Sequence, residues 1–239
     1  MKYVKIFFVL MAVLFCSCSS SLLFHDDFDS DVAGRPPLRN PPGDPVGDMI
    51  YIASDLSEAI PNPTEVISTG AITGQSLRYS NLDILYLVRE VRFFSKEITR
   101  TAPNYWASWV GRLQNFTNAT APLDLVFGSN ELGVVWLRIT DGQFFIDTAG
   151  HGAAFEPIGR YSPGTDHTII IRIDNRARTY GVVIFQGSET FRIGPRPLRS
   201  RPEDKERTLT LTMRFSGDLH SSASYVIDDI NMSEEEPER

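Results

Sequence analysis

The sequence predicts an all-β protein that folds as one antiparallel β-sandwich of two sheets. Three observations predict it: many short segments alternate apolar and polar residues, turn-forming residues separate them, and only one short stretch has a convincing helical pattern. The alternation is clearest at 208–215 (TLTLTMRF). A period of two is typical of strands with one buried face. The length of 239 residues and the 42% hydrophobic content suit one sizeable core.

The chain begins with the pattern of an export signal. Two lysines lie within residues 1–5, an unbroken run of 11 apolar residues follows at 6–16, and small residues surround Cys18. That run is too short to cross a membrane, because a spanning helix needs about 20 apolar residues. We therefore expect residues 1–17 to be a cleaved signal peptide and the mature chain to start at Cys18.

The segment before Cys18 resembles the lipobox of bacterial lipoproteins, in which a small residue precedes an acylated cysteine. Ser17 matches that small residue, whereas Phe15 stands where leucine is usual, and Cys16 is a competing anchor behind the bulky Phe15. The resemblance implies a lipid anchor on Cys18, since several acyl chains give lasting attachment. We expect a place in the bacterial cell envelope, at the outer membrane because Ser19 is not Asp. The alternative is an ordinary cleaved signal with a chance cysteine.

The expected elements follow in order along the mature chain. Leu22 to Phe28 is the first expected strand, and 34–48 is a loop or an edge, because its five prolines lack the N–H that a sheet ladder needs. A short helix is expected near Ser54 to Ile60. The later strands should face the core with Tyr105, Ala107, Trp109 and Leu113; Val135, Leu137 and Ile139; Ile169, Ile171 and Ile173; Tyr180, Val182 and Ile184; and Leu209, Leu211, Met213 and Phe215.

Domain organisation and charge exclude some classes of partner. We expect a single sandwich domain at 18–232 and a disordered acidic tail at 233–239. Without Lys2 and Lys5 the mature chain keeps 21 basic and 30 acidic residues. An acidic chain without a basic cluster argues against nucleic acid as a partner. Cleavage before Cys18 would leave one thiol, so no internal disulfide is expected.

Three segments together resemble concanavalin A-like jelly-roll domains of the lectin and glucanase type. Residues 24–37 (FHDDFDSDVAGRPP) resemble their opening strand and loop, and 166–183 (DHTIIIRIDNRARTYGVV) resemble their central hairpin. Residues 225–232 (YVIDDINM) resemble their closing strand, which pairs beside the first. Asp166 departs from the pattern, because a tryptophan before the histidine is common. The resemblance spans nearly the whole mature chain and implies a two-sheet jelly roll, often with a sugar ligand.

Clustered acidic residues near both ends form a candidate metal site. If the first and last strands are neighbours, the carboxylates of Asp27, Asp29 and Asp228 converge. Calcium takes six to eight oxygen ligands, which clustered carboxylates and loop carbonyls can supply. The resemblance also implies a structural calcium near the termini. The alternative is that these carboxylates are solvated or cap turns, since no EF-hand loop is present.

Aromatic residues on expected outer faces form a candidate ligand site. Sugars stack their C–H faces on aromatic rings while polar side chains hold the hydroxyls. Trp106 and Trp109 alternate, so one should point inward, and we assign Trp109 to the core. We take Trp106, Trp136 and Arg138 as candidate ligand-binding residues, because Trp136 and Arg138 share a face. The alternative is that these rings pack between the sheets.

No catalytic constellation is found in the sequence. The alternating acidic residues of laminarinase-like hydrolases and the Gln-x-His strand of alginate lyases are absent, and the four histidines lack metal-ligand spacing. We therefore expect a non-catalytic, lipid-anchored binding module with carbohydrate as its ligand class. Two alternatives stay open: a structural or assembly lipoprotein that contacts another envelope protein, and a cryptic polysaccharide-degrading enzyme.

Overall fold

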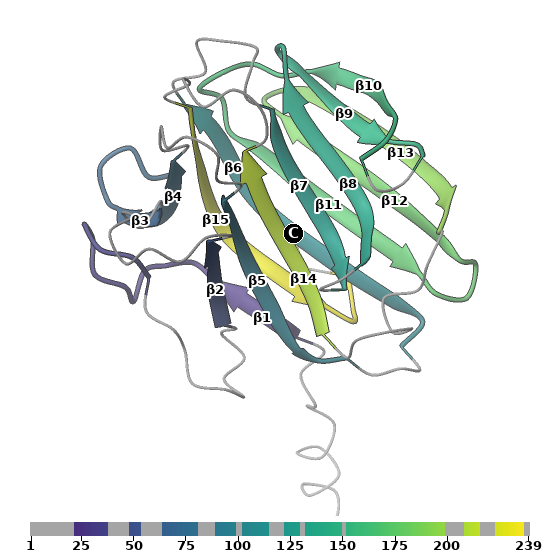
Figure 1. The fold of residues 1–239 in the computed structure, drawn as a ribbon, viewed down its shortest axis with the longest axis horizontal. Coiled ribbons are helices and arrows are strands. Elements are labelled where there is room, and N and C mark those ends of the chain that lie inside the picture. The colour runs from purple at the N-terminus through teal and green to yellow at the C-terminus, as the bar shows by residue number, and fades with distance from the viewer. Residues whose placement is uncertain are drawn as a thin grey trace, which may run out of the picture.

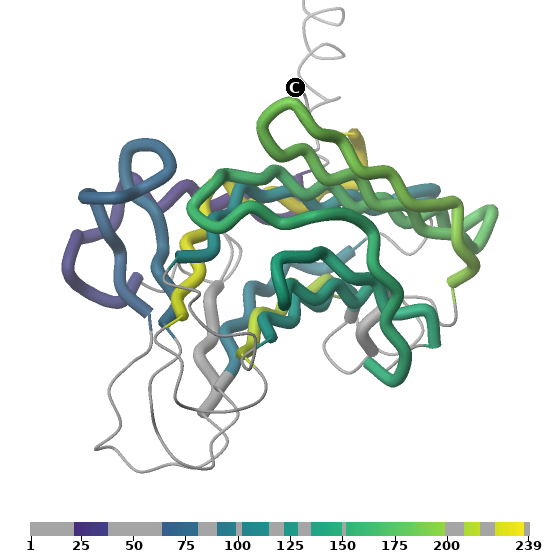
Figure 2. Tube along the Cα trace, turned by 90° about the horizontal axis from the view of Figure 1, so that it is seen from above, coloured from purple at the N-terminus to yellow at the C-terminus, as the bar shows by residue number. Residues whose placement is uncertain are grey.

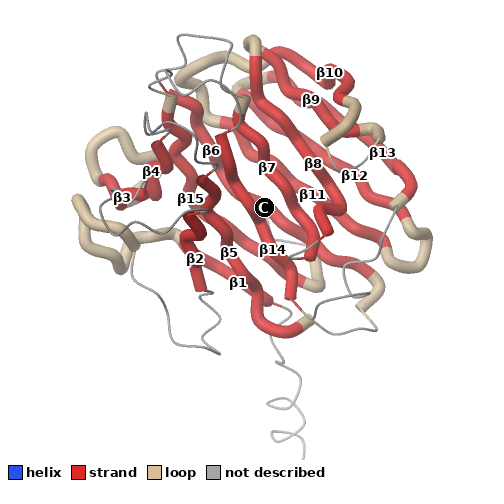
Figure 3. Tube along the Cα trace, viewed as in Figure 1, coloured by secondary structure: helices blue, strands red, loops and turns tan. Residues whose placement is uncertain are grey.

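The computed structural model describes residues 22–37, 48–53, 64–80, 89–98, 102–114, 122–129, 132–149, 152–198, 208–215 and 223–236. These residues contain strands and turns and no helix (Figure 3). The strands are β1 (Leu22–Asp26), β2 (Asp48–Ala53), β3 (Thr64–Ile67), β4 (Ser76–Ser80), β5 (Arg89–Glu97), β6 (Asn104–Gln114), β7 (Leu123–Ser129), β8 (Leu132–Thr140), β9 (Gln143–Asp147), β10 (Phe155–Arg160), β11 (His167–Asp174), β12 (Thr179–Gln186), β13 (Glu189–Pro197), β14 (Thr208–Phe215) and β15 (Ser224–Ser233).

The strands form two antiparallel sheets that lie face to face (Figures 1 and 2). Sheet A has the order β13-β12-β11-β6-β15-β4-β3, and β1 also pairs with β15. Sheet B has the order β10-β9-β8-β7-β14-β5-β2. The predicted two-sheet sandwich is therefore confirmed, and both sheets have a central strand flanked by partners from distant parts of the sequence.

The core lies between the two sheets and is built from every second residue of the central strands. In β6 the burial alternates along the whole strand, so Trp109 is 1% exposed while Trp106 is only half-buried. The same alternation buries one face of β11, β12 and β14, as their sequences predict. Each of these large apolar side chains contributes about 1.5–3 kcal/mol to folding, because its surface is removed from water.

The ends of the domain meet as the sequence predicts. β1 is antiparallel to β15, with Leu22 opposite Ser233 and Asp26 opposite Ile230. The first strand ends at Asp26 and not at Phe28, because Phe28 has a left-handed backbone (φ 59°) and turns its ring into the core. The expected helix at Ser54–Ile60 lies outside the described residues. Within the described part of the chain, no helix has the length and apolar character needed to cross a membrane.

Candidate functional site

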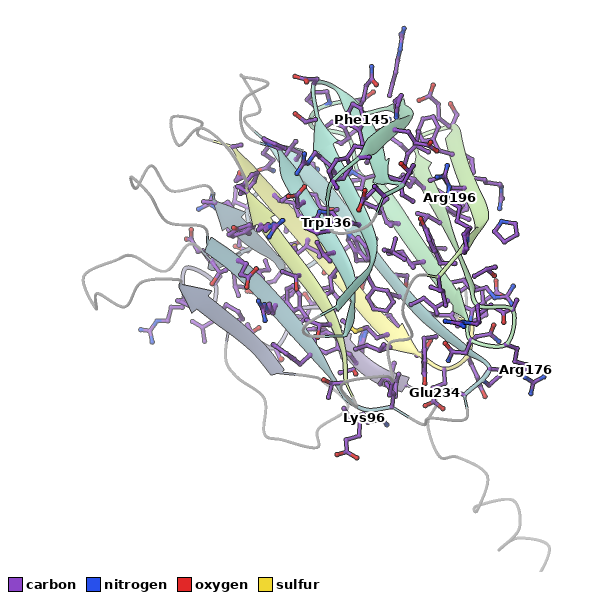
Figure 4. The ribbon with its side chains drawn as sticks, turned by 45° about the vertical axis from the view of Figure 1, so that its right-hand side comes forward. Lys96, Trp136, Phe145, Arg176, Arg196 and Glu234 are labelled. Carbon is purple, nitrogen blue, oxygen red and sulfur yellow. The ribbon has the colours of Figure 1, made fainter. Side chains whose placement is uncertain are left out.

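The outer face of sheet B carries two of the predicted ligand-binding residues. Trp136 and Arg138 both point outward from β8, since Val135, Leu137 and Ile139 take the core-facing positions. The sheet register places Arg214 of β14, Asp124 of β7 and Arg138 of β8 in one row. Figure 4 shows Trp136 over the middle strands of this sheet. The predicted pair does share a face.

An ion cluster fills the centre of this row. The carboxylate of Asp124 is fully buried and accepts hydrogen bonds from Arg138 Nε (2.7 Å) and Nη2 (3.1 Å) and from Arg214 Nε (3.3 Å). The Arg138 guanidinium also lies over the Phe155 ring, 4.0 Å from its centroid. A buried carboxylate needs such cationic partners, because an unpaired buried charge is strongly destabilising.

Trp136 is covered by its own protein. The Arg214 guanidinium lies 4.6 Å from the centroid of its ring, and Phe155 meets it edge-on at 6.4 Å. Gly152 packs so closely that a Cβ there would lie 3.0 Å from the indole. Asp147 holds this loop by accepting the N–H groups of Gly152 and its neighbours Ala149 and Ala154. The ring is thus half-buried within a packed network of its own protein.

A groove lies on the opposite side of the molecule, on the outer face of sheet A. Trp106 of β6, Arg172 of β11 and Gly181 of β12 form one row across the sheet. Gly181 has no side chain at its outward position, and its backbone lines the groove. Next to Gly181 the register between β12 and β13 shifts. Gly194 (φ 114°) lies so close that a Cβ added at Gly194 would be 2.8 Å from the Gly181 Cα.

The groove has a volume of about 560 Å³, which is within the usual range for small-ligand sites. Trp106, Ile170 and Val183 give it an apolar floor, and Arg172 and Arg192 are among its charged lining residues. The structure therefore separates the three predicted ligand-binding residues: Trp106 lies in this groove, while Trp136 and Arg138 lie on the other sheet.

Arg172 is held in a defined position beside Trp106. Its Nε and Nη2 donate to Asn104 Oδ1 at 3.1 and 2.9 Å, and Nη2 also donates to Asp174 Oδ2 at 3.2 Å. Its guanidinium carbon lies 5.5 Å from the centroid of the Trp106 ring. Asp174 in turn accepts the Ala177 N–H at 2.8 Å through Oδ1, so both of its oxygens are engaged. An aromatic ring beside oriented polar groups is the arrangement that sugar binding requires.

The predicted metal ligands accept hydrogen bonds from the β3–β4 turn. Asp228 accepts from Thr73 N (3.1 Å), Thr73 Oγ1 (2.8 Å) and Ser76 Oγ (3.0 Å), and Asp29 accepts from Gln75 N (2.7 Å). Asp27 accepts the N–H of Asp29. In the described ranges no three His, Cys, Asp or Glu side chains are grouped to hold a metal ion. Structural calcium therefore stays a prediction.

The acidic residues near the chain ends affect one another electrostatically. Burial raises the pKa of Asp26 to about 7, the Phe28 N–H that it accepts lowers it, and the nearby carboxylates of Asp31, Asp27 and Asp228 raise it further. Burial also raises the pKa of Asp228, against the hydrogen bonds from Thr73 and Ser76. No arginine or lysine is paired with Asp26 in the described structure, in contrast to Asp124.

A buried polar network in the core was not foreseen from the sequence. His167 Nε2 lies 2.9 Å from the Tyr225 hydroxyl, which also accepts the Trp109 Nε1–H at 3.1 Å. Burial lowers the pKa of His167 to about 3, so the ring is neutral at physiological pH. The hydroxyl of Tyr225 occupies space that a Cβ at Gly111 would need. This network is closed off from the surface and orders the core.

The residues that sequence analysis missed lie on strands far apart in the chain. Asp124 and Arg214 complete the sheet B cluster, and Gly181 and Arg192 complete the groove. Strand alternation does signal that Arg192 and Arg214 point outward. Their proximity to tryptophans depends on the order of strands in each sheet, for which the sequence has no local signal.

Comparisons with known proteins agree on the fold. Neither a protein-family model nor a curated protein matches this chain in sequence. Similar solved structures include the catalytic domain of the glycoside hydrolase family 131 protein from Coprinopsis cinerea, with a TM-score of 0.62, 11% identity and coverage of 91% of this chain and 95% of that one. Lectin UEA-II complexed with galactose has a TM-score of 0.51 and 7% identity over 77% of this chain and 92% of that one.

A sialidase is also similar, with a TM-score of 0.55 and 15% identity over 89% of this chain, which spans only 18% of the sialidase. At such identities the likeness shows the fold alone. The chain has the concanavalin A-like jelly-roll fold found in lectins and glycosidases, as the sequence resemblance predicts.

Proposed function

We propose that this protein is a non-catalytic carbohydrate-binding module and that its site is the groove on the outer face of sheet A. The observation that carries the proposal is the half-buried Trp106 on the floor of a groove of about 560 Å³, next to the oriented guanidinium of Arg172. A pyranose ring can pack its C–H face on the indole while the charged groups hold its hydroxyls. The shared fold with lectins is consistent with this function.

The same proposal places the module at the bacterial outer membrane, anchored by acyl chains on Cys18. The link from Cys18 to the start of β1 at Leu22 is short, because four residues reach at most about 14 Å. Leu22, Ser233 and Trp106 lie on neighbouring strands in register. With a strand spacing of about 4.8 Å, the Trp106 Cα lies about 10 Å from that of Leu22. The groove would therefore face ligands close to the membrane surface.

Glycan-array binding by the full-length protein in detergent tests the carbohydrate proposal. We expect retention of at least one glycan class, with Trp106→Ala reducing retention about tenfold or more, since ring stacking is lost. Trp136→Ala is the matched control and should leave retention unchanged. Failure of the protein to bind any glycan would reject the proposal and favour a protein partner. Release of new reducing ends from a bound polysaccharide would instead reveal an enzyme.

The anchor has its own test, independent of the ligand. Replacing Cys18 with Ala should move the protein from the membrane fraction to the soluble fraction, because the acylated side chain is lost. Cys16→Ala should leave it in the membrane fraction. Retention of the Cys18→Ala protein in the membrane fraction would contradict lipid attachment at Cys18.

A further inference from the structure

We propose that the sugar bound in the sheet A groove is an acidic one, whose carboxylate binds Arg192 while its ring packs on Trp106. This inference rests on the proposed carbohydrate-binding function and specifies its substrate class.

Arg192 is exposed on β13, with its Cα opposite that of Val183 on the groove floor. Within the described structure its side chain makes no hydrogen bond or ion pair, although it lines the groove. Other arginines are engaged: Arg138 and Arg214 with Asp124, and Arg196 with Glu156. Arg192 therefore offers its whole planar fork of donors to a ligand, and this fork matches a carboxylate in a bidentate manner.

Arg172 offers one further hydrogen-bond donor to the same ligand. Asn104 and Asp174 take up its Nε and Nη2, which leaves Nη1 without a hydrogen bond to the described residues. The Asp174 charge is compensated, because both its oxygens accept hydrogen bonds. Arg172 is thus held rigidly beside the ring of Trp106, with one nitrogen left for a ligand oxygen.

Charged residues of both signs surround the groove. Arg176 and Arg178 flank the lining residue Ala177 in the β11–β12 turn, and both are exposed (Figure 4 shows Arg176 extending from this end). Among the lining residues, Arg172 and Arg192 are matched in number by the carboxylates Asp174 and Glu236. The preference for an anion therefore rests on the unpaired side chain of Arg192 and not on the net charge around the groove.

The test compares one oligosaccharide in two charge states. We would titrate the full-length protein in detergent with tetragalacturonic acid and with its methyl ester, using isothermal titration calorimetry at low salt. We expect the acid to bind roughly tenfold more tightly than the ester, because a charge-assisted hydrogen bond to Arg192 is absent from the ester. The acid should also lose affinity as salt is raised, whereas the ester should not.

Variants separate the two parts of the site. Arg192→Gln should reduce acid affinity roughly tenfold and leave ester affinity unchanged, while Trp106→Ala should weaken both ligands. Arg160→Gln, which removes an exposed arginine from β10 on the other sheet, is the charge-matched control and should change neither. Unfolding curves for each variant would verify that the fold is intact.

The remaining outcomes distinguish the acidic-sugar inference from the proposed carbohydrate-binding function. Equal binding of acid and ester through Trp106 would overturn the acidic-sugar inference and leave carbohydrate binding intact. Unchanged acid affinity in Arg192→Gln, or displacement of the acid by an equal concentration of inorganic phosphate, would also overturn it. Absence of binding by both ligands, together with an empty glycan array, would reject the proposed function itself.

Discussion

The two outer faces of the sandwich use the same residue types in different ways. Each has a tryptophan and an arginine at outward positions of its middle strands. On sheet B, Arg214 covers Trp136 and joins Arg138 around the buried Asp124. On sheet A, Trp106, Arg172 and Gly181 line a groove. A tryptophan next to an arginine is thus a packed network or an open site depending on what the neighbouring strands supply.

The largest expected effect tests whether the sheet B network is structural. Asp124→Ala should lower the free energy of unfolding by about 3–5 kcal/mol, since two guanidiniums lose their buried counter-ion. Asp174→Ala in the groove should lower the free energy of unfolding by less than about 1 kcal/mol, because its partner Arg172 is solvent-exposed. Urea unfolding measures both. Similar losses for the two variants would contradict the contrast between the faces.

A third carboxylate tests whether cationic partners are what permit burial. Asp26 is 8% exposed and lacks an arginine among its described neighbours, and its pKa rises from 3.8 to about 7. Between these values the folded state binds more protons than the unfolded state, so stability falls as pH rises from about 4 to about 7. The fall is at most about 4 kcal/mol, from the size of the shift.

The corresponding experiment is urea unfolding between pH 5 and pH 8.5. Asp26→Asn should flatten the decline and be the more stable protein at pH 8, because no charge is buried. Some decline should persist, since burial raises the pKa of Asp228 in the same direction. A wild-type protein whose stability rises over this range would show that Asp26 is not buried as an uncompensated acid.

Replacing each of the two tryptophans by alanine should separate the effect on stability from the effect on ligand binding. Trp136→Ala should reduce the free energy of unfolding by about 2 kcal/mol, because its ring packs on Gly152, Phe155 and Arg214. Trp106→Ala, in the open groove, should cost about 1 kcal/mol and abolish most ligand binding. Unfolding curves and calorimetric titration of the same samples give both values. The opposite assignment of effects would move the site to sheet B.

Two glycines give the smallest and most specific test. Gly152 has φ 72° and faces the Trp136 indole, so Gly152→Ala should destabilise the protein by about 1–2 kcal/mol through strain and crowding. A Cβ at Gly181 would lie 3.3 Å from the Ile193 carbonyl oxygen, at the hollow of the groove. Gly181→Ala should therefore change stability by less than about 1 kcal/mol and weaken ligand affinity. Equal ligand affinities in the two variants would argue against the groove as the site.

Much of the fold could be predicted because strand patterns are local. The alternation in β6, β11, β12 and β14 identified the buried face of each strand, and the pairing of the first and last strands was predicted correctly. The end of β1 was missed, since Phe28 leaves the strand with a left-handed backbone that aromatic residues rarely adopt. The pattern could not show that its ring turns back into the core.

The candidate site could be predicted only in part. The sequence indicated that Trp106, Trp136 and Arg138 point outward, but it placed them in one candidate set, whereas the structure divides them between two sheets. The sequence also did not indicate that Asp124 is fully buried beside Arg138 and Arg214. These three residues come from strands β7, β8 and β14, respectively. Such neighbours are separated by many residues in the chain, so no spacing rule relates them.

The sequence by itself determined the class of fold, because the hydrophobic effect acts on every second side chain of a strand and leaves a period that can be read locally. The order of strands in each sheet, and with it the separate roles of Trp106 and Trp136, was decided only by the tertiary structure. The physical reason is that a ring is open or covered according to the side chains of adjacent strands. Gly181 lines the groove two strands away from Trp106, and Arg214 packs on the ring of Trp136.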